Sequence, residues 1–126
     1  MIVIDASALI TILVATHGAS ALHLLTRPLI APTHLPIETV SALRNLVLAD
    51  HLNETTAWRA LGQLAALPVE LSSPLMPRIW ALRHNLTPYD AAYVAMAEAR
   101  GCPLVTADAR LARVPGTHCE VEVLEQ

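Results

Sequence analysis

The sequence predicts an α/β fold, a three-layer α/β/α sandwich with a central, mainly parallel β-sheet. Short apolar runs at 2–4, 28–32 and 103–107 have the length and composition of strands that are buried on both faces. Longer stretches with helical periodicity separate these runs, and strands that alternate with helices are typical of a parallel sheet covered by helices. The 126 residues are 54% hydrophobic and 15% charged, which indicates a single globular domain over residues 1–126.

Apolar periodicity and the positions of proline and glycine predict where each element begins and ends. Proline is tolerated in the first turn of a helix, so Pro36, Pro74 and Pro77 mark helix starts. Thr87 is a suitable N-cap, and Gly101 ends the same helix as a C′ residue. The expected elements are, in order, a strand at 2–4, a helix from Ala6 or Ser7, a helix around 19–26, a strand at 28–32, a helix from Thr33 or His34 to about 49, a helix over 54–66, a strand or extended link at 68–71, a helix from Pro74 to about Asn85, a helix over 87–100, a strand at 103–107, a short helix over 107–113 and an edge strand at 119–125.

The composition argues against several functions. All eight basic residues are arginine, and without lysine the chain has neither a Walker A P-loop nor Schiff-base chemistry. Phosphotransfer through an aspartyl-phosphate on Asp5 is poorly supported for the same reason, because such enzymes normally place a lysine near the phosphate. The formal net charge of −3 does not favour nucleic-acid binding through a basic face, so a phosphate ligand would need a local patch or a metal.

The sequence also predicts the location and redox state of the protein. The amino-terminal segment lacks the basic start of a signal peptide, and no stretch approaches the roughly 18 apolar residues of a membrane span. Cys102 and Cys119 are too few for a disulfide framework, and no Cys/His cluster has zinc-ligand spacing. We therefore expect a cytoplasmic protein with no membrane association and two buried free thiols. The six histidines show no ligand spacing and are assigned no role.

Aspartate is rare in this chain, and two of the four aspartates follow predicted strands. Asp5 comes directly after the run at 2–4, and Asp108 follows the run at 103–107. Because the C-terminal ends of parallel strands meet at one edge of a sheet, both should project from that edge if the strands are neighbours. Burying an unpaired carboxylate is costly, so Asp5 must cap an element, lie at the surface or meet a cation.

Two further carboxylates lie near the starts of predicted helices. Asp90 is at position N3 of the helix opened by Thr87, and helix capping alone explains it at least as well as a functional role. Glu38 lies on a helix face made of small or polar side chains, which suits the wall of a groove. Taken singly, Glu38 is explained better by a solvent-exposed helix face. The members of that face are Glu38, Ser41, Ala42 and Asn45. The apolar stripe expected to face the core is Ile37, Val40, Leu43 and Val47.

Together, the four carboxylates Asp5, Glu38, Asp90 and Asp108 predict a metal site. Two such charges 4 Å apart repel by about 4 kcal/mol at an effective dielectric of 20, so a cluster needs bound cations or protonated members. Oxygen ligands favour Mg²⁺ or Mn²⁺ over zinc, and carboxylate-held Mg²⁺ suits phosphodiester hydrolysis. Ser7 and Thr106, each two residues from a strand-end aspartate, can hold the carboxylates in place. Helix capping by Ser7 and the strand propensity of Thr106 explain each hydroxyl equally well.

Arginine and tryptophan side chains have weaker signals. Arg44, Arg110 and Arg113 flank two of the acidic motifs and are candidates for RNA phosphate contacts, although surface solubility explains each of them singly. Trp58 and Trp80 occur in helical patterns, and core packing is the favoured interpretation. The alternative is that they line an apolar groove in which a partner helix docks.

Three stretches carry a family resemblance: MIVIDASAL, PIETVSALRNLV and LTPYDAAYVAMAEARGCPLVTADARLAR. In their order and spacing they resemble the PIN-domain ribonucleases, and within them the VapC-type toxins of bacterial toxin–antitoxin pairs. The resemblance implies a PIN-like domain over 1–126 with an acidic pocket for Mg²⁺ or Mn²⁺. It implies that Asp5, Glu38, Asp90 and Asp108 form the pocket, with Asp5 and Asp108 as direct ligands, and that Ser7 and Thr106 support it.

The resemblance also implies an activity and partners. The family hydrolyses RNA phosphodiester bonds and inhibits growth until a cognate VapB-type antitoxin binds it, as a homodimer and as a toxin–antitoxin hetero-oligomer. One departure is that many relatives carry paired arginines after the second acidic residue, where this chain has Arg44 followed by Asn45. The alternative function is a catalytically weak PIN scaffold that binds RNA or antitoxin, which the net negative charge favours. Which RNA is cleaved is left open.

Overall fold

The computed structural model describes residues 1–14, 22–73 and 75–124. In these residues five strands form one sheet in the order β3-β2-β1-β4-β5, and every described strand pairing is parallel. The expected parallel sheet is therefore confirmed. The strands are β1 (Ile2–Ile4), β2 (Leu29–Pro32), β3 (Val69–Ser72), β4 (Leu104–Thr106) and β5 (Val121–Val123).

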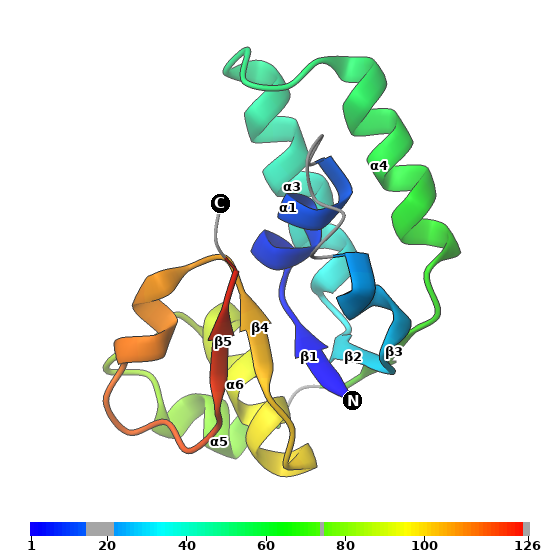
Figure 1. Cartoon of the computed structure of the whole chain (residues 1–126). Coiled ribbons are helices and arrows are strands. Elements are labelled where there is room, and N and C mark those ends of the chain that lie inside the picture. The colour runs from blue at the N-terminus through cyan, green and yellow to red at the C-terminus, as the bar shows by residue number, and fades with distance from the viewer. Residues whose placement is uncertain (15–21, 74, 125–126) are drawn as a thin grey trace.

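Helices cover both faces of this sheet. From β1 the chain steps outward to β2 and β3, and later returns to add β4 and β5 on the other side, so right-handed connections place α1 and α6 on opposite faces. Helix α6 packs against β1, β2 and β4, whereas α1 packs against β4 and against the α3–α4 pair, which extends beyond the sheet (Figure 1). The helices are α1 (Ala6–Val14), α3 (Leu35–Leu48), α4 (Glu54–Ala66), α5 (Met76–Ala81) and α6 (Pro88–Arg100), with 3₁₀ helices η1 (His23–Thr26) and η2 (Ala109–Arg113). None of the described helices is long and apolar enough to cross a membrane.

The expected elements are present, and two of the helices differ in extent. Helix α6 has Thr87 as its N-cap and ends at Gly101, which adopts the predicted left-handed conformation with φ of 62°. The helix expected to reach about Asn85 is shorter, because its continuation tightens into i→i+3 hydrogen bonds at Arg83 and Asn85 after α5 ends. The helix expected around 19–26 lies partly outside the described residues, and its described part is η1.

Helix α3 buries the predicted stripe only in part, because Leu43 is buried and Val47 packs against the core but Ile37 and Val40 do not. Its buried residues are Leu35, Thr39 and Leu43, whereas Ile37 is 74% exposed and Val40 is exposed as well. The reason is that α3 packs against α1 and α4 rather than lying flat on the sheet, which rotates its buried face. Apolar side chains are thereby left on the surface of the α3–α4 pair.

Both tryptophans lie on the surface, so the prediction that they pack in the core is wrong. Trp58 on α4 is 77% exposed, and Trp80 on α5 is also exposed. Trp58 is left outside because the buried residues of α4 are Ala57 and Ala60. The Arg83 guanidinium lies 4.5 Å from the centroid of the Trp80 ring. Both cysteines are free, as predicted, but they are half-buried rather than buried.

Candidate active site

Asp5 lies where β1 ends and α1 begins, and its carboxylate caps that helix. The backbone N–H of Asp5 donates to the Val105 carbonyl at 3.2 Å, which extends the pairing of β1 with β4. Asp5 Oδ1 accepts a hydrogen bond from the Ala8 N–H at 2.9 Å. The residue is only 5% exposed. Asp5 therefore lies at the point where the strand order reverses, the usual position of a binding site in this kind of sheet.

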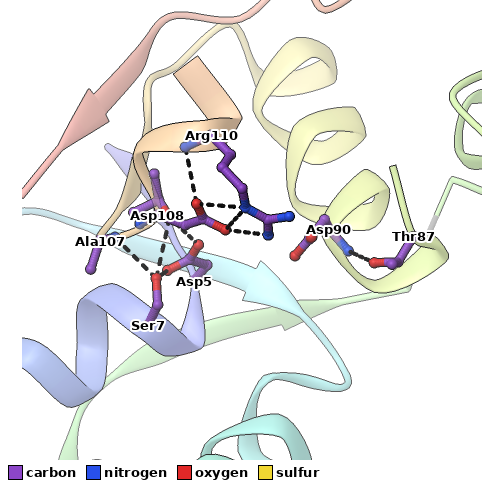
Figure 2. Close-up of polar contacts among 8 residues, drawn as sticks. Asp5, Ser7, Thr87, Asp90, Ala107, Asp108 and Arg110 are labelled. Atoms are coloured by element: carbon purple, nitrogen blue, oxygen red, sulfur yellow. Dashed lines mark hydrogen bonds and ion pairs between the residues drawn. The ribbon is translucent and has the colours of Figure 1, made fainter. Parts of the chain in front are cut away.

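Two hydroxyl groups hold the Asp5 carboxylate. Thr106, which lies opposite Asp5 when the β1–β4 register is continued, donates to Oδ2 at 2.5 Å, and Ser7 donates to Oδ1 at 2.7 Å. The same two hydroxyls also fix the chain after β4. Thr106 Oγ1 accepts the Asp108 N–H at 3.0 Å and Ser7 Oγ accepts the Ala107 N–H at 3.0 Å, as Figure 2 shows around Ser7. Both predicted supporting residues thus contact Asp5.

Burial raises the pKa of the Asp5 carboxyl above its ordinary value. The hydrogen bonds from Thr106, Ala8 and Ser7 stabilise the charged form and oppose this shift, whereas the negative charge of Asp90 adds to it. The neutral donors orient the carboxylate without cancelling its charge.

Asp108 follows β4 and is paired with a positive charge. Arg110 Nε lies 3.1 Å from each carboxylate oxygen, and Arg110 Nη2 donates to Oδ2 at 2.6 Å. The Arg110 backbone N–H also donates to Oδ1 at 3.0 Å, so Asp108 caps η2. These hydrogen bonds lower the pKa of the Asp108 carboxyl. Arg113, on the same 3₁₀ helix, acts on Asp108 through its charge.

Asp90 and Glu38 come from α6 and α3 and complete the acidic set. Thr87 Oγ1 accepts the Asp90 N–H at 3.2 Å, so the predicted cap is present and it places the Asp90 side chain toward Arg110 (Figure 2). Burial and the charge of Asp108 raise the pKa of Asp90. Burial and the charges of Asp90 and Asp5 raise the pKa of Glu38. Asp5, Glu38 and Asp90 therefore act on one another through their charges, and Asp108 acts on Asp90.

Two residues at the site were missed from the sequence, His34 and Tyr93. The Tyr93 hydroxyl, which is buried, donates to Glu38 Oε1 at 3.4 Å, and His34 Nε2 lies 3.4 Å from Glu38 Oε2. The His34 ring meets the Tyr93 ring edge-on at 5.0 Å, and burial lowers the pKa of His34. Helical spacing was the available signal, because His34 precedes Glu38 by four residues and Tyr93 follows Asp90 by three. The sequence pattern assigns His34 no role, and the structure places it beside Glu38.

The donor set suits a hard cation, although it is not assembled as a closed ligand shell. In the described parts of the chain, no three His, Cys, Asp or Glu side chains are arranged closely enough to hold a metal ion. The side chains are nevertheless all oxygen donors, which Mg²⁺ and Mn²⁺ prefer. Burial raises the pKa values of Asp5, Glu38 and Asp90, and repulsion from neighbouring carboxylates is a smaller cause. A divalent cation bound among them would stabilise their charged forms.

The predicted small face of α3 and Arg44 line two different grooves. Part of the small face lines an open groove of about 770 Å³, which Ser7 also lines. Its other lining residues are Ile10, Thr11, Val14, Ala42, Asn45, Leu46 and His51. Arg44 lies elsewhere, beside Trp58 in the groove between α3 and α4, so the structure does not bring it to the acidic residues.

Comparison with known proteins defines the class first. Residues 2–117 match the family model of the PIN domain, and the chain belongs to the PIN-domain family. Ribonuclease VapC1 of Mycobacterium tuberculosis is 44% identical over 130 residues, which cover 97% of this chain and 96% of that protein. Within the PIN domains the chain is therefore a member of the VapC family.

Two solved structures share the fold. A protein from Pyrobaculum aerophilum, PAE2754, superposes with a TM-score of 0.74 at 27% identity, over 97% of this chain and 83% of that chain. The second is VapBC2 of Rickettsia felis, which was solved bound to a DNA fragment from the VapBC2 promoter. It superposes with a TM-score of 0.65 at 16% identity, over 99% of this chain and 100% of that chain. At that identity the second likeness concerns the fold alone.

Proposed function

We propose that this protein is the endoribonuclease toxin of a toxin–antitoxin pair, and that it hydrolyses RNA phosphodiester bonds with the help of Mg²⁺ or Mn²⁺. The observation that carries the proposal is the convergence of Asp5 and Asp108 at the ends of neighbouring parallel strands, joined through Thr106. Glu38 and Asp90 add two carboxylates from α3 and α6. Membership of the VapC family supports RNA as the substrate.

In this proposal Asp5 and Asp108 are direct metal ligands, and Glu38 and Asp90 bind the ion directly or through water. A bound Mg²⁺ or Mn²⁺ would supply positive charge to a phosphate oxygen and lower the pKa of the attacking water. Thr106 and Ser7 keep the Asp5 oxygens oriented, and Tyr93 does the same for Glu38. The side chains are thus positioned before the substrate arrives.

The substrate's phosphates need positive charge near the carboxylates. Arg110 and Arg113 lie on η2 directly after Asp108, and we assign them contacts with RNA phosphate groups. Arg44 lies on the surface near Trp58, so its predicted phosphate contact would belong to a more distant part of the RNA. The net charge of −3 makes such local contacts necessary.

The exposed apolar surface of α3 and α4 supports an antitoxin as partner. A groove of about 220 Å³ runs between these helices, lined by Val40, Val47, Leu48, Trp58 and Leu61 among others, and an amphipathic segment of a VapB-type antitoxin would cover it. The protein would act in the cytoplasm as a single PIN domain, as a homodimer and as a hetero-oligomer with the antitoxin. Trp58→Glu should prevent co-purification with the antitoxin while RNA cleavage persists. Retained co-purification would argue against this groove as the docking site.

Induction in a bacterial host tests the toxin assignment. The wild type should arrest growth and generate new RNA 5′ ends, and Asp5→Asn should do neither because it removes a metal-ligand charge. Asp50→Asn is the matched control, since Asp50 is an exposed aspartate outside the site with φ of 58°, a conformation that asparagine tolerates. The control should remain toxic. A folded Asp5→Asn protein that cuts RNA at the wild-type rate would contradict the proposal.

A second candidate is a catalytically weak PIN scaffold that binds RNA or antitoxin. It is favoured by the open arrangement of the carboxylates, which in the described residues do not form a ready ligand group. Calorimetric titration with Mn²⁺ separates the two candidates. Absence of binding to the folded, antitoxin-free chain would favour the scaffold.

A further inference from the structure

Arg110 occupies both oxygens of a candidate metal ligand. Its Nε and Nη2 atoms bind the Asp108 carboxylate in a forked arrangement, with the shortest contact, from Nη2 to Oδ2, at 2.6 Å. A carboxylate held in this way cannot approach a cation closely until the guanidinium moves, because the two positive charges would compete for the same oxygens and repel each other.

The guanidinium also lies next to a second carboxylate of the acidic set, that of Asp90. Figure 2 shows it between the carboxylates of Asp108 and Asp90. Its charge lowers the pKa of Asp90, and that of Asp108 more directly through hydrogen bonds. Arg110 thus supplies positive charge at a place where the proposed function requires a metal ion.

Among the described residues, only Asp108 forms hydrogen bonds with the Arg110 side chain, and Asp90 acts on it through charge alone. The Arg110 side chain is 74% exposed, and its described side-chain hydrogen bonds all go to Asp108. By contrast, Arg78 binds the Glu98 carboxylate and also donates to the Gly116 carbonyl at 2.8 Å. An exposed, singly anchored pair exchanges with water and competing ions far more readily.

We infer that Arg110 is an exchangeable counter-ion of the active site. It neutralises Asp108 in the metal-free protein, gives up Asp108 to the divalent cation, and is then free to bind a phosphate group of the RNA. The inference rests on the proposed function, because it presupposes that Asp108 is a metal ligand. Metal binding releases Arg110, and phosphate binding keeps Arg110 away from Asp108. Bound metal therefore strengthens RNA binding, and bound RNA strengthens metal binding by the same factor.

Calorimetric titration of the full, antitoxin-free chain with Mn²⁺ tests this competition without reference to activity. Arg110→Gln should bind Mn²⁺ about two- to fivefold more tightly than the wild type, the range set by an exposed ion pair. Arg113→Gln is the matched control. Arg113 acts on Asp108 through its charge, but among the described contacts it forms no hydrogen bond with the Asp108 carboxylate. Its affinity should change much less. Arg110→Lys should stay near the wild type.

Three outcomes overturn the inference. The first is wild-type affinity for Mn²⁺ in Arg110→Gln. The second is an equal gain in Arg113→Gln, which would show that bulk charge rather than contact sets the affinity. The third is the same gain in Mn²⁺ affinity from Arg110→Gln in an Asp108→Asn background, where there is no carboxylate at position 108 for Arg110 and Mn²⁺ to compete for. In all three cases Mn²⁺ still binds, so the proposed function survives. If neither the wild type nor any variant binds Mn²⁺, the inference and the proposed function fail together.

Discussion

Two aspartates stand at the ends of neighbouring strands, and the protein treats them in opposite ways. Asp5 is buried and receives hydrogen bonds from uncharged donors, namely Ser7, Ala8 and Thr106, and its pKa is raised. Asp108 is more accessible and is paired with a charged partner, Arg110, and its pKa is lowered. Hydrogen bonds from uncharged donors orient a carboxylate but do not neutralise it, so it can still attract a cation. A guanidinium neutralises the carboxylate until the guanidinium is displaced.

In the proposed function this difference separates two tasks within one site. Asp5, which is held by Ser7, Ala8 and Thr106, would be the fixed ligand of the cation. Asp108, which precedes a short 3₁₀ helix, would exchange Arg110 for the cation. We infer that one side of such a site is preorganised and that the other side responds to metal and RNA.

Thr106→Val removes the hydroxyl that bonds both the Asp5 carboxylate and the Asp108 backbone, and it should have the largest effect on cleavage of the variants that leave all four carboxylates in place. The substitution deletes the donor to Asp5 and the acceptor for the Asp108 N–H. RNA cleavage at saturating Mn²⁺ should fall about 10- to 100-fold, as for other residues that orient metal ligands. Thr106→Ser keeps the hydroxyl and should stay within a few-fold of the wild type. Equal rates for Thr106→Val and the wild type would show that the hydroxyl does not matter.

Glu98→Gln compares a structural ion pair with the exchangeable one. The Glu98 side chain is only 12% exposed, binds Arg78 through both oxygens and accepts the His118 N–H at 2.7 Å. Its replacement should lower the free energy of unfolding by about 1–2 kcal/mol, with RNA cleavage retained. Asp108→Asn should do the reverse, with little loss of stability and a large loss of cleavage. Urea unfolding and a cleavage assay on both variants measure the contrast.

The stabilisation from Glu98 should depend on pH. Its hydrogen bonds with Arg78 lower its pKa from the ordinary 4.5 in the folded protein, so the unfolded chain binds a proton more readily. The contribution is therefore fully present above about pH 4.5 and is lost as the pH falls through the lowered value. The stability difference between the wild type and Glu98→Gln should shrink below pH 4. A difference that stays constant down to pH 3 would contradict this assignment.

Glu38→Gln should give a smaller effect of the opposite sign. The pKa of Glu38 is raised in the folded protein, so ionising it costs stability as the pH rises from about 4.5 through that raised value. The amide should raise the free energy of unfolding at pH 7 by about 0.5–1 kcal/mol, and the Tyr93 hydrogen bond can persist to the amide oxygen. Cleavage should fall in the same variant. A destabilised Glu38→Gln protein would show that burial and repulsion do not dominate at this position.

The sequence predicted the local features of this molecule better than its packing. The buried strand at 2–4 and the cap and terminator of α6, Thr87 and Gly101, depend on a few adjacent residues, and they are confirmed. The exposure of Ile37 and Trp58 depends on how α3 and α4 pack against α1, which a periodic pattern does not encode. His34 lies only four residues before Glu38, at the start of α3, whereas the contact of Tyr93 with Glu38 joins α6 to α3 and requires their tertiary arrangement. The same limit applies to Arg110, because its position over Asp108 is a matter of side-chain geometry.

We propose that carboxylates from the end of β1, from α3, from α6 and from the segment after β4 act as one divalent-cation site for RNA cleavage. The most direct test of this proposal is cleavage of a labelled RNA by the purified wild type and by Asp5→Asn, Glu38→Gln, Asp90→Asn and Asp108→Asn, with Mn²⁺ and with EDTA. The wild type should cleave with Mn²⁺ only, and each folded variant should lose at least about tenfold in rate. Cleavage in EDTA, or wild-type rates in Asp5→Asn or Asp108→Asn, would contradict the proposal.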